Sequence, residues 1–281
     1  MPSRTLLWPA RCAALLVAFG FIAITSAQNP NPPSSPTANT NDQWLAQTAK
    51  LYYSSTKAGL QSFDCALHPD WRALYSTNAG GSLAPEDAQR AALLSSVSMA
   101  LHGRLKGGSS LDWNPPDQQF NTDQTNLLNQ MHDALNQTLM GFMQFWTPFV
   151  DGSVVPDNSG GLDIGPQPDG GLGIHLVQSD IDLTEVFDSG HILRQYNIVM
   201  SGTKIEVTPT YSPSDHGLVI THFHAYIHAA DDPQKTQEMN VEVAYQWLEG
   251  FPIPARLDME VTGVATLHFT LDGCTVQRQT P

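Results

Sequence analysis

The chain has 281 residues, of which 41% are hydrophobic, and its 27 acidic residues outnumber its 13 lysines and arginines, so its net charge at pH 7 is −14. An acidic surface repels the phosphates of nucleic acids, which excludes a general role in nucleic-acid binding. A charge of this size also favours solubility. From the length of the chain we expect residues 42–278 to form a single α+β domain.

The first 27 residues have the pattern of an export signal. Arg4 and Arg11 make the start basic, an apolar run covers residues 12–24, and residues 25–27 are small, as at a cleavage site. The run is as long as a signal-peptide core and too short to span a bilayer comfortably, so we expect cleavage rather than an uncleaved anchor. The mature protein is then exported, to the periplasm or the extracellular space. Residues 28–41 are mainly Pro, Ser, Asn and Thr without charge, and predict a disordered lead-in.

Helical and extended patterns alternate in the first half of the mature chain. Asp42 is a suitable N-terminal cap, and Pro85 suits the first turn of a helix. The sequence predicts a helix from Gln43 to near Gly59, a strand over 60–67, a helix from Pro85 to about Ser96 and a strand over 98–107.

The longest predicted helix covers residues 122–149, with Asn121 or Thr122 as its cap. Apolar residues recur along it at helical spacing from Leu128 to Phe149. Its second half is apolar on nearly every side, which is typical of a helix that is buried or that faces a ligand. Packing in the core is the default interpretation, and a ligand wall is the alternative.

The last third of the chain alternates apolar and polar residues with period two, which predicts strands. Val241, Val243, Tyr245 and Trp247 form the apolar face of one of them, and two prolines within 250–254 predict a turn. The predicted strands cover about 174–179, 181–188, 192–200, 203–210, 217–229 and three runs of an antiparallel meander over 240–274. Residues 151–173, rich in Gly, Pro and Asp, are predicted to be a long loop.

Signal cleavage leaves two cysteines, Cys65 and Cys274. In an oxidising compartment an even pair usually forms a disulfide, so we predict a bridge between the first and the last strand. A catalytic thiol is the alternative, and the sequence shows no base beside either cysteine.

Three histidines follow one face of a predicted strand, at His222, His224 and His228. Residues two apart on a strand are ~7 Å apart, so two imidazoles can reach one cation. The three are therefore candidate metal ligands, with His268 or His191 as a further ligand. The simpler interpretation is that they form the solvent-facing side, because apolar residues occupy the other side of the strand.

No complete catalytic motif is present. The sequence lacks a phosphate loop, a dinucleotide fingerprint, Gly-x-Ser-x-Gly and His-Glu-x-x-His. Outward carboxylates at Glu242, Asp258 and Glu260 are commonplace on an acidic protein. A non-enzymatic role is favoured, and no cofactor is predicted.

Two stretches carry a resemblance to a known family. "LQSFDC" at residues 60–65 and "EVAYQWLEGFPIPARLDMEV" at residues 242–261 resemble strands of the lipoprotein-carrier superfamily (LolA/LppX-like). The resemblance implies a curved antiparallel sheet, an incomplete barrel, with about three helices packed on its concave face. It also implies that acyl chains or other apolar molecules are carried between the sheet and the helices.

These patterns lead to three hypotheses. The first is an exported protein that binds an apolar small molecule or lipid, with a site lined by Phe142, Met143, Trp146, Trp247 and Phe251. The second is a structural or assembly protein of the cell envelope, with a filled core and an envelope protein as partner. The third is a metal-dependent enzyme built on the histidine face.

Overall fold

The computed structural model describes residues 40–78, 83–105, 108–152, 154–179, 181–229, 232, 236–263 and 265–279. The predicted signal peptide and the lead-in up to residue 39 lie outside this range. Thr40 and Asn41, predicted as the end of the lead-in, belong to the first described helix.

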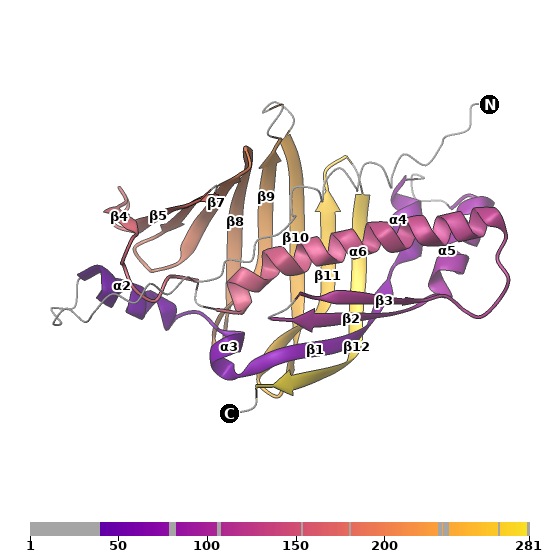
Figure 1. The fold of residues 1–281 in the computed structure, drawn as a ribbon, viewed down its shortest axis with the longest axis horizontal. Coiled ribbons are helices and arrows are strands. Elements are labelled where there is room, and N and C mark those ends of the chain that lie inside the picture. The colour runs from indigo at the N-terminus through magenta and orange to yellow at the C-terminus, as the bar shows by residue number, and fades with distance from the viewer. Residues whose placement is uncertain are drawn as a thin grey trace.

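One open antiparallel sheet organises the described part of the chain (Figure 1). Its twelve strands have the order β3-β2-β1-β12-β11-β10-β9-β8-β7-β6-β5-β4, so β12 pairs with β1 and the edges β3 and β4 do not meet. The strands are β1 (Leu60–Pro69), β2 (Ser98–Arg104), β3 (Ser110–Asn114), β4 (Asp163–Pro166), β5 (Leu172–Gln178), β6 (Ile181–Phe187), β7 (Leu193–Met200), β8 (Thr203–Ser214), β9 (Gly217–His228), β10 (Thr236–Leu248), β11 (Phe251–Val261) and β12 (Ala265–Arg278).

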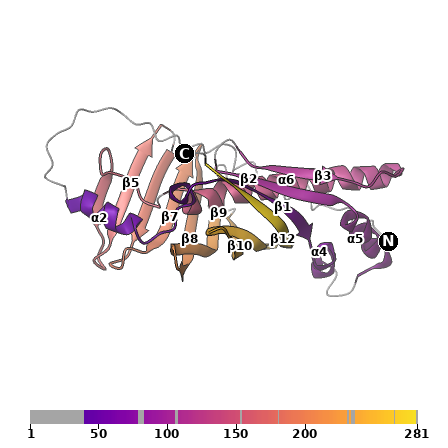
Figure 2. The ribbon, with the colours of Figure 1, turned by 90° about the horizontal axis from the view of Figure 1, so that it is seen from below.

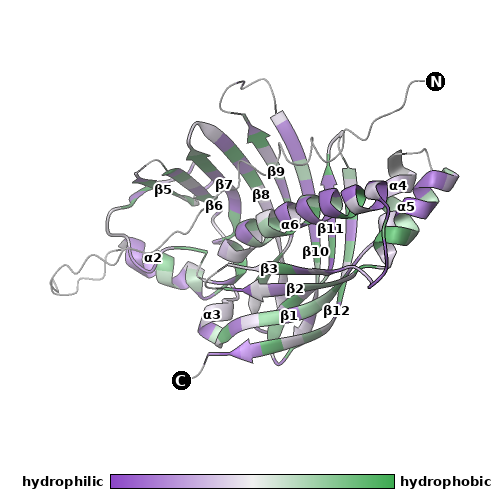
Figure 3. Cartoon of the chain, turned by 45° about the vertical axis from the view of Figure 1, so that its right-hand side comes forward, coloured by the Kyte–Doolittle hydropathy of each residue, from purple (hydrophilic) through white to green (hydrophobic). Residues whose placement is uncertain are grey.

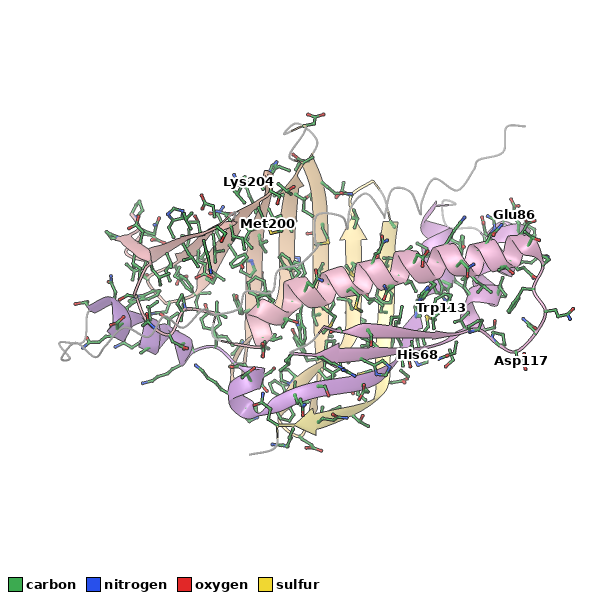
Figure 4. All side chains as sticks on the ribbon, in the orientation of Figure 1. His68, Glu86, Trp113, Asp117, Met200 and Lys204 are labelled. Atoms are coloured by element: carbon green, nitrogen blue, oxygen red, sulfur yellow. A yellow bond between two sulfur atoms is a disulfide. The ribbon has the colours of Figure 1, made fainter. Side chains whose placement is uncertain are left out.

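Helix α6 (Thr122–Val150) lies across the concave face of the sheet (Figures 1 and 2). Asn121 caps it: its side chain accepts a hydrogen bond from the Gln124 backbone, whose own side chain accepts one from the Asn121 backbone. The helix reaches from β3, where Trp113 lies 5.6 Å from the His132 ring, to the middle of the sheet (Figure 4). Its buried residues include Leu128, Met131, Leu135, Leu139, Phe142, Met143, Trp146 and Phe149.

Four shorter helices complete the described structure: α2 (Thr40–Ala49), α3 (Ser55–Ala58), α4 (Trp71–Asn78) and α5 (Pro85–Ser95). α4 packs against β12 and α5 packs against α4, at the end of the molecule opposite α2 (Figure 2).

The predicted single helix over 43–59 is two helices. The chain leaves the helix after Ala49, and the backbones of Leu51 and Tyr53 bond to Leu218 on β9 at 2.7 and 2.9 Å. A new helix begins at Ser55, where the Ser54 hydroxyl accepts a hydrogen bond from the Lys57 backbone. Pairing with a strand far along the chain therefore overrides the local helical pattern.

The α+β fold class, with a curved, open antiparallel sheet and helices on its concave face, is confirmed, and the described ranges contain five helices rather than about three. Strand residues alternate between hydrophobic and hydrophilic along their length (Figure 3). The apolar side chains form one continuous core, whose most buried large members include Phe63, Trp146, Phe187, Phe223, Phe251 and Phe269.

The sequence patterns did not predict α4, β3 and β4. The prediction of a turn over 250–254 is wrong. The turn consists of Glu249 and Gly250, whose φ angles of 52° and 86° suit a tight hairpin, and β11 begins at Phe251. Pro252 and Pro254 are tolerated in this strand because β12 pairs with β11 only from Arg256 onward.

Candidate functional site

The structure separates the five residues that the sequence suggests for ligand binding. Phe142, Met143 and Trp146 are at most 3% exposed and lie between α6 and the sheet. The Trp146 indole donates a hydrogen bond of 2.8 Å to the Tyr245 hydroxyl, which donates one of 2.6 Å to the Ile220 carbonyl. These contacts bind the second half of α6 to the sheet.

Trp247 and Phe251 lie at a different place, around the hairpin between β10 and β11. Trp247, expected on the buried face of β10, is 41% exposed and is not packed on the core. Its ring meets the edge of Tyr53 at 5.9 Å and the His216 ring at 5.3 Å. Phe251 is 1% exposed and forms part of the floor of a cleft.

This cleft, which we call the α2–α3 cleft, has a volume of about 710 Å³. Such a volume is within the range typical of small-molecule sites. The cleft is bounded by the two helices, the link between them, and turns that follow α6, β8 and β10. It is lined by Leu45, Ala46, Ala49, Lys50, Tyr52, Tyr53, Ser54, Lys57, Ala58, Pro156, Asp157, His216, Glu249, Gly250 and Phe251.

The floor of the α2–α3 cleft is buried and mainly apolar, whereas its rim is charged. Leu45, Tyr52, Tyr53 and Phe251 are each at most 5% exposed. Burial raises the pKa of both tyrosines, so their hydroxyls are neutral at physiological pH. Lys50, Lys57, Asp157, His216 and Glu249 are exposed on the rim.

The link between α2 and α3 is held firmly against the sheet. The Tyr52 hydroxyl donates to the His191 carbonyl at 3.0 Å and accepts from the Leu193 backbone at 2.7 Å. The Ser54 hydroxyl donates to the Asp151 carbonyl at 2.9 Å. Two buried anchors thus fix one wall of the cleft.

Two lysines at the rim have no ion-pair partner in the described part of the chain, Lys50 and Lys57. Glu249, by contrast, is paired with Arg278 at 3.0 Å, and the Arg278 guanidinium lies 4.8 Å from the Phe251 ring centre. The cleft therefore combines an aromatic floor with free ammonium groups.

A buried carboxyl group lies on the inner side of β6. Glu185 is 7% exposed, pairs across the sheet with Tyr196, and its Oε2 has no hydrogen-bond partner. Loss of hydration raises its pKa to about 8, so the group is protonated at neutral pH. In the sequence, Glu185 lies in the same period-two row as Ile181, Leu183 and Phe187, and this position indicates a buried carboxyl group.

The three candidate metal ligands lie on β9, and two of them are paired with carboxylates. His224 Nε2 is 2.8 Å from Glu238, and His228 Nε2 is 2.9 Å from Glu206. Within the described ranges no group of three or more His, Cys, Asp or Glu side chains is placed to hold a metal ion. His222, the third candidate ligand, also lies on β9.

The two further ligands suggested by the sequence lie outside β9 and have other partners. His268 is on β12, three strands from β9 or ~14 Å, and lies 2.7 Å from Asp258. His191 stacks on Trp44 at 4.6 Å and contacts the Thr48 hydroxyl at 2.7 Å. In the described part of the chain, neither joins the β9 histidines in a group that could hold a metal ion.

His102 on β2 lies between Asp64 on β1 and Asp112 on β3. Hydrogen bonds to these carboxylates raise the pKa of His102. Because the two carboxylates face different ring nitrogens, the group links three strands rather than surrounding one ion.

Cys65 and Cys274 form a disulfide between β1 and β12, as their sequence predicts, with Cα atoms 4.1 Å apart. In the described chain, none of the helices combines the length and the apolar character needed to cross a membrane.

No protein-family model matches the sequence, and no curated protein matches it. Among solved structures, a LolA superfamily protein from Nitrosomonas europaea aligns with 87% of this chain and 96% of its own, at 9% identity and a TM-score of 0.28. A TM-score this low supports no particular function.

The residues of the α2–α3 cleft, Phe251 apart, were not found from the sequence. Leu45, Tyr52 and Tyr53 look like one side of a continuous helix, and only their contacts with distant strands show that the chain opens there.

Proposed function

We propose that this protein is an exported binding protein that holds an apolar ligand, such as a lipid or an acyl chain, between the sheet and its N-terminal helices. The observation that carries the proposal is the α2–α3 cleft, with its floor of buried aromatic and aliphatic side chains. The disulfide supports export, because such bonds persist in oxidising compartments.

Filling the cleft tests this proposal. Ala46 is exposed and lines the cleft, so Ala46→Trp is expected to occupy it without disturbing the core. Gln47→Trp is the matched control, because Gln47 is an exposed neighbour on α2 that does not line the cleft.

The measurement is binding of a fluorescent fatty-acid probe to the purified mature protein, together with mass spectrometry of organic extracts. We expect the wild type and Gln47→Trp to bind the probe and Ala46→Trp to lose it. A folded wild type that neither binds the probe nor contains lipid would contradict the proposal.

A structural or assembly role with a filled core, and an envelope protein as partner, is the second candidate. The observation that favours it is the dense packing around Phe142, Met143 and Trp146, which leaves these side chains at most 3% exposed. Absence of ligand binding, together with capture of the protein in a defined envelope complex, would favour this role over the first.

A further inference from the structure

The charges of the α2–α3 cleft point to the class of ligand, provided that the cleft is a binding site as proposed above. Lys50 and Lys57 both line the cleft, and both are exposed. An exposed ammonium without a partner is available to an anion from solution.

Basic groups without an ion pair are few in the part of the chain that the structure describes. Of the nine lysines and arginines in the described ranges, five are ion-paired: Arg90, Arg194, Lys204, Arg256 and Arg278. The four without an ion pair are Lys50, Lys57, Arg72 and Arg104. Half of the free basic groups therefore lie at one cleft.

The charge balance of the rim suits a single negative charge. Arg278 neutralises Glu249, and Asp157 offsets one of the two lysines, which leaves one positive charge uncompensated. His216, the remaining polar group on the rim, packs against Trp247. A dianionic head group would exceed the charge that the rim supplies.

We infer that the α2–α3 cleft binds a long-chain fatty acid, with its carboxylate at Lys50 and Lys57 and its chain along the apolar lining residues that reach the surface, Ala46, Ala49 and Pro156. The carboxylate forms charge-assisted contacts at the solvent edge, while the chain leaves water. No other part of the ligand needs a polar partner.

Competition against the fluorescent probe at neutral pH and low ionic strength tests the inference. The competitors are oleate, oleyl alcohol of the same chain, and oleoyl lysophosphatidate, which carries a phosphate. The proteins are the wild type, Lys50→Gln, Lys57→Gln, the double variant and Arg72→Gln. The last is the matched control, since it removes an unpaired basic residue from α4, outside the cleft.

We expect the wild type to prefer oleate to oleyl alcohol, and each cleft lysine variant to bind oleate up to about fivefold more weakly. Oleyl alcohol is expected to bind all the variants equally, and Arg72→Gln to behave as the wild type. Added salt should weaken binding of oleate alone.

Equal binding of oleate and oleyl alcohol to the wild type would overturn this inference and leave the proposed binding function intact. Tighter binding of lysophosphatidate than of oleate would overturn the assignment of a carboxylate in favour of a phosphate. If none of the three displaces the probe from the wild type, both the inference and the proposed cleft fail.

Discussion

At the scale of single residues, Glu185 is the clearest source of a pH-dependent stability. It is buried on the inner side of β6 without a partner for Oε2, and its pKa is raised to about 8. The unfolded chain releases this proton near its ordinary pKa of 4.5, whereas the folded chain keeps it until about pH 8. The free energy of unfolding therefore falls as pH rises through this window, by up to ~5 kcal/mol.

Glu185→Gln should remove this dependence, because an amide does not ionise. Urea unfolding is expected to show little change from the wild type near pH 4 and a stabilisation of several kcal/mol near pH 8. Glu242→Gln, on the exposed side of β10, is the control and should change neither value. A difference between Glu185→Gln and the wild type that is the same at both pH values would contradict this account.

His102 makes a second, smaller contribution of known sign. Because Asp64 and Asp112 raise its pKa in the folded protein, its stabilisation is complete below its ordinary pKa and is lost as pH rises through the raised one. His102→Asn is expected to cost about 1 kcal/mol or less at acidic pH and almost nothing at alkaline pH, as measured by urea unfolding. A cost that does not depend on pH would indicate a packing effect instead.

At the scale of elements, α6 determines whether the concave face is a core or a container. Trp146 is fully buried and bonded to Tyr245, whereas Trp247 is 41% exposed. Trp146→Ala is expected to lower the free energy of unfolding by about 3–5 kcal/mol, because it leaves a cavity and removes a hydrogen bond. Trp247→Ala, the matched substitution, should cost about 1 kcal/mol or less.

Chemical denaturation of each variant without ligand measures these two changes in the free energy of unfolding. If Trp146→Ala unfolds like the wild type but loses ligand, then Trp146 is the wall of a ligand site, as the sequence allowed. A large loss of stability with unchanged probe binding at the α2–α3 cleft is the result that the packing indicates.

At the scale of the whole molecule, the pairing of β1 with β12 joins the first described strand to the last. The disulfide Cys65–Cys274 crosses this seam with a sequence separation of 209 residues. In the chain-entropy model, a loop of this length contributes up to about 5 kcal/mol, because the cross-link restricts the unfolded chain.

Replacing both cysteines by serine should therefore lower the urea midpoint substantially while the fold is retained. Wild-type protein in reductant is expected to unfold at the same lower midpoint, which separates loss of the bond from effects of the serines. An unchanged midpoint in both would show that the seam is held by strand pairing alone.

Local sequence patterns determined much of the architecture. The alternation from residue 174 onward predicted β5 to β12 closely, and the spacing of apolar residues predicted α6, with Asn121 as one of two candidate caps. The presence of two cysteines after the signal segment predicted the disulfide Cys65–Cys274. The strands and the helix depend on residues near one another in the chain. The disulfide could be predicted because two cysteines allow only one pairing.

Only the tertiary structure decided where the chain departs from its local pattern. Tyr52 leaves a helical pattern because Leu218 on a distant strand bonds to the backbone on either side of it, and this break creates the α2–α3 cleft. Trp247 continues an apolar row but is exposed, because it lies beyond the packed core. Both outcomes depend on residues far away in the sequence, and local periodicity contains no information about where those residues lie in the fold.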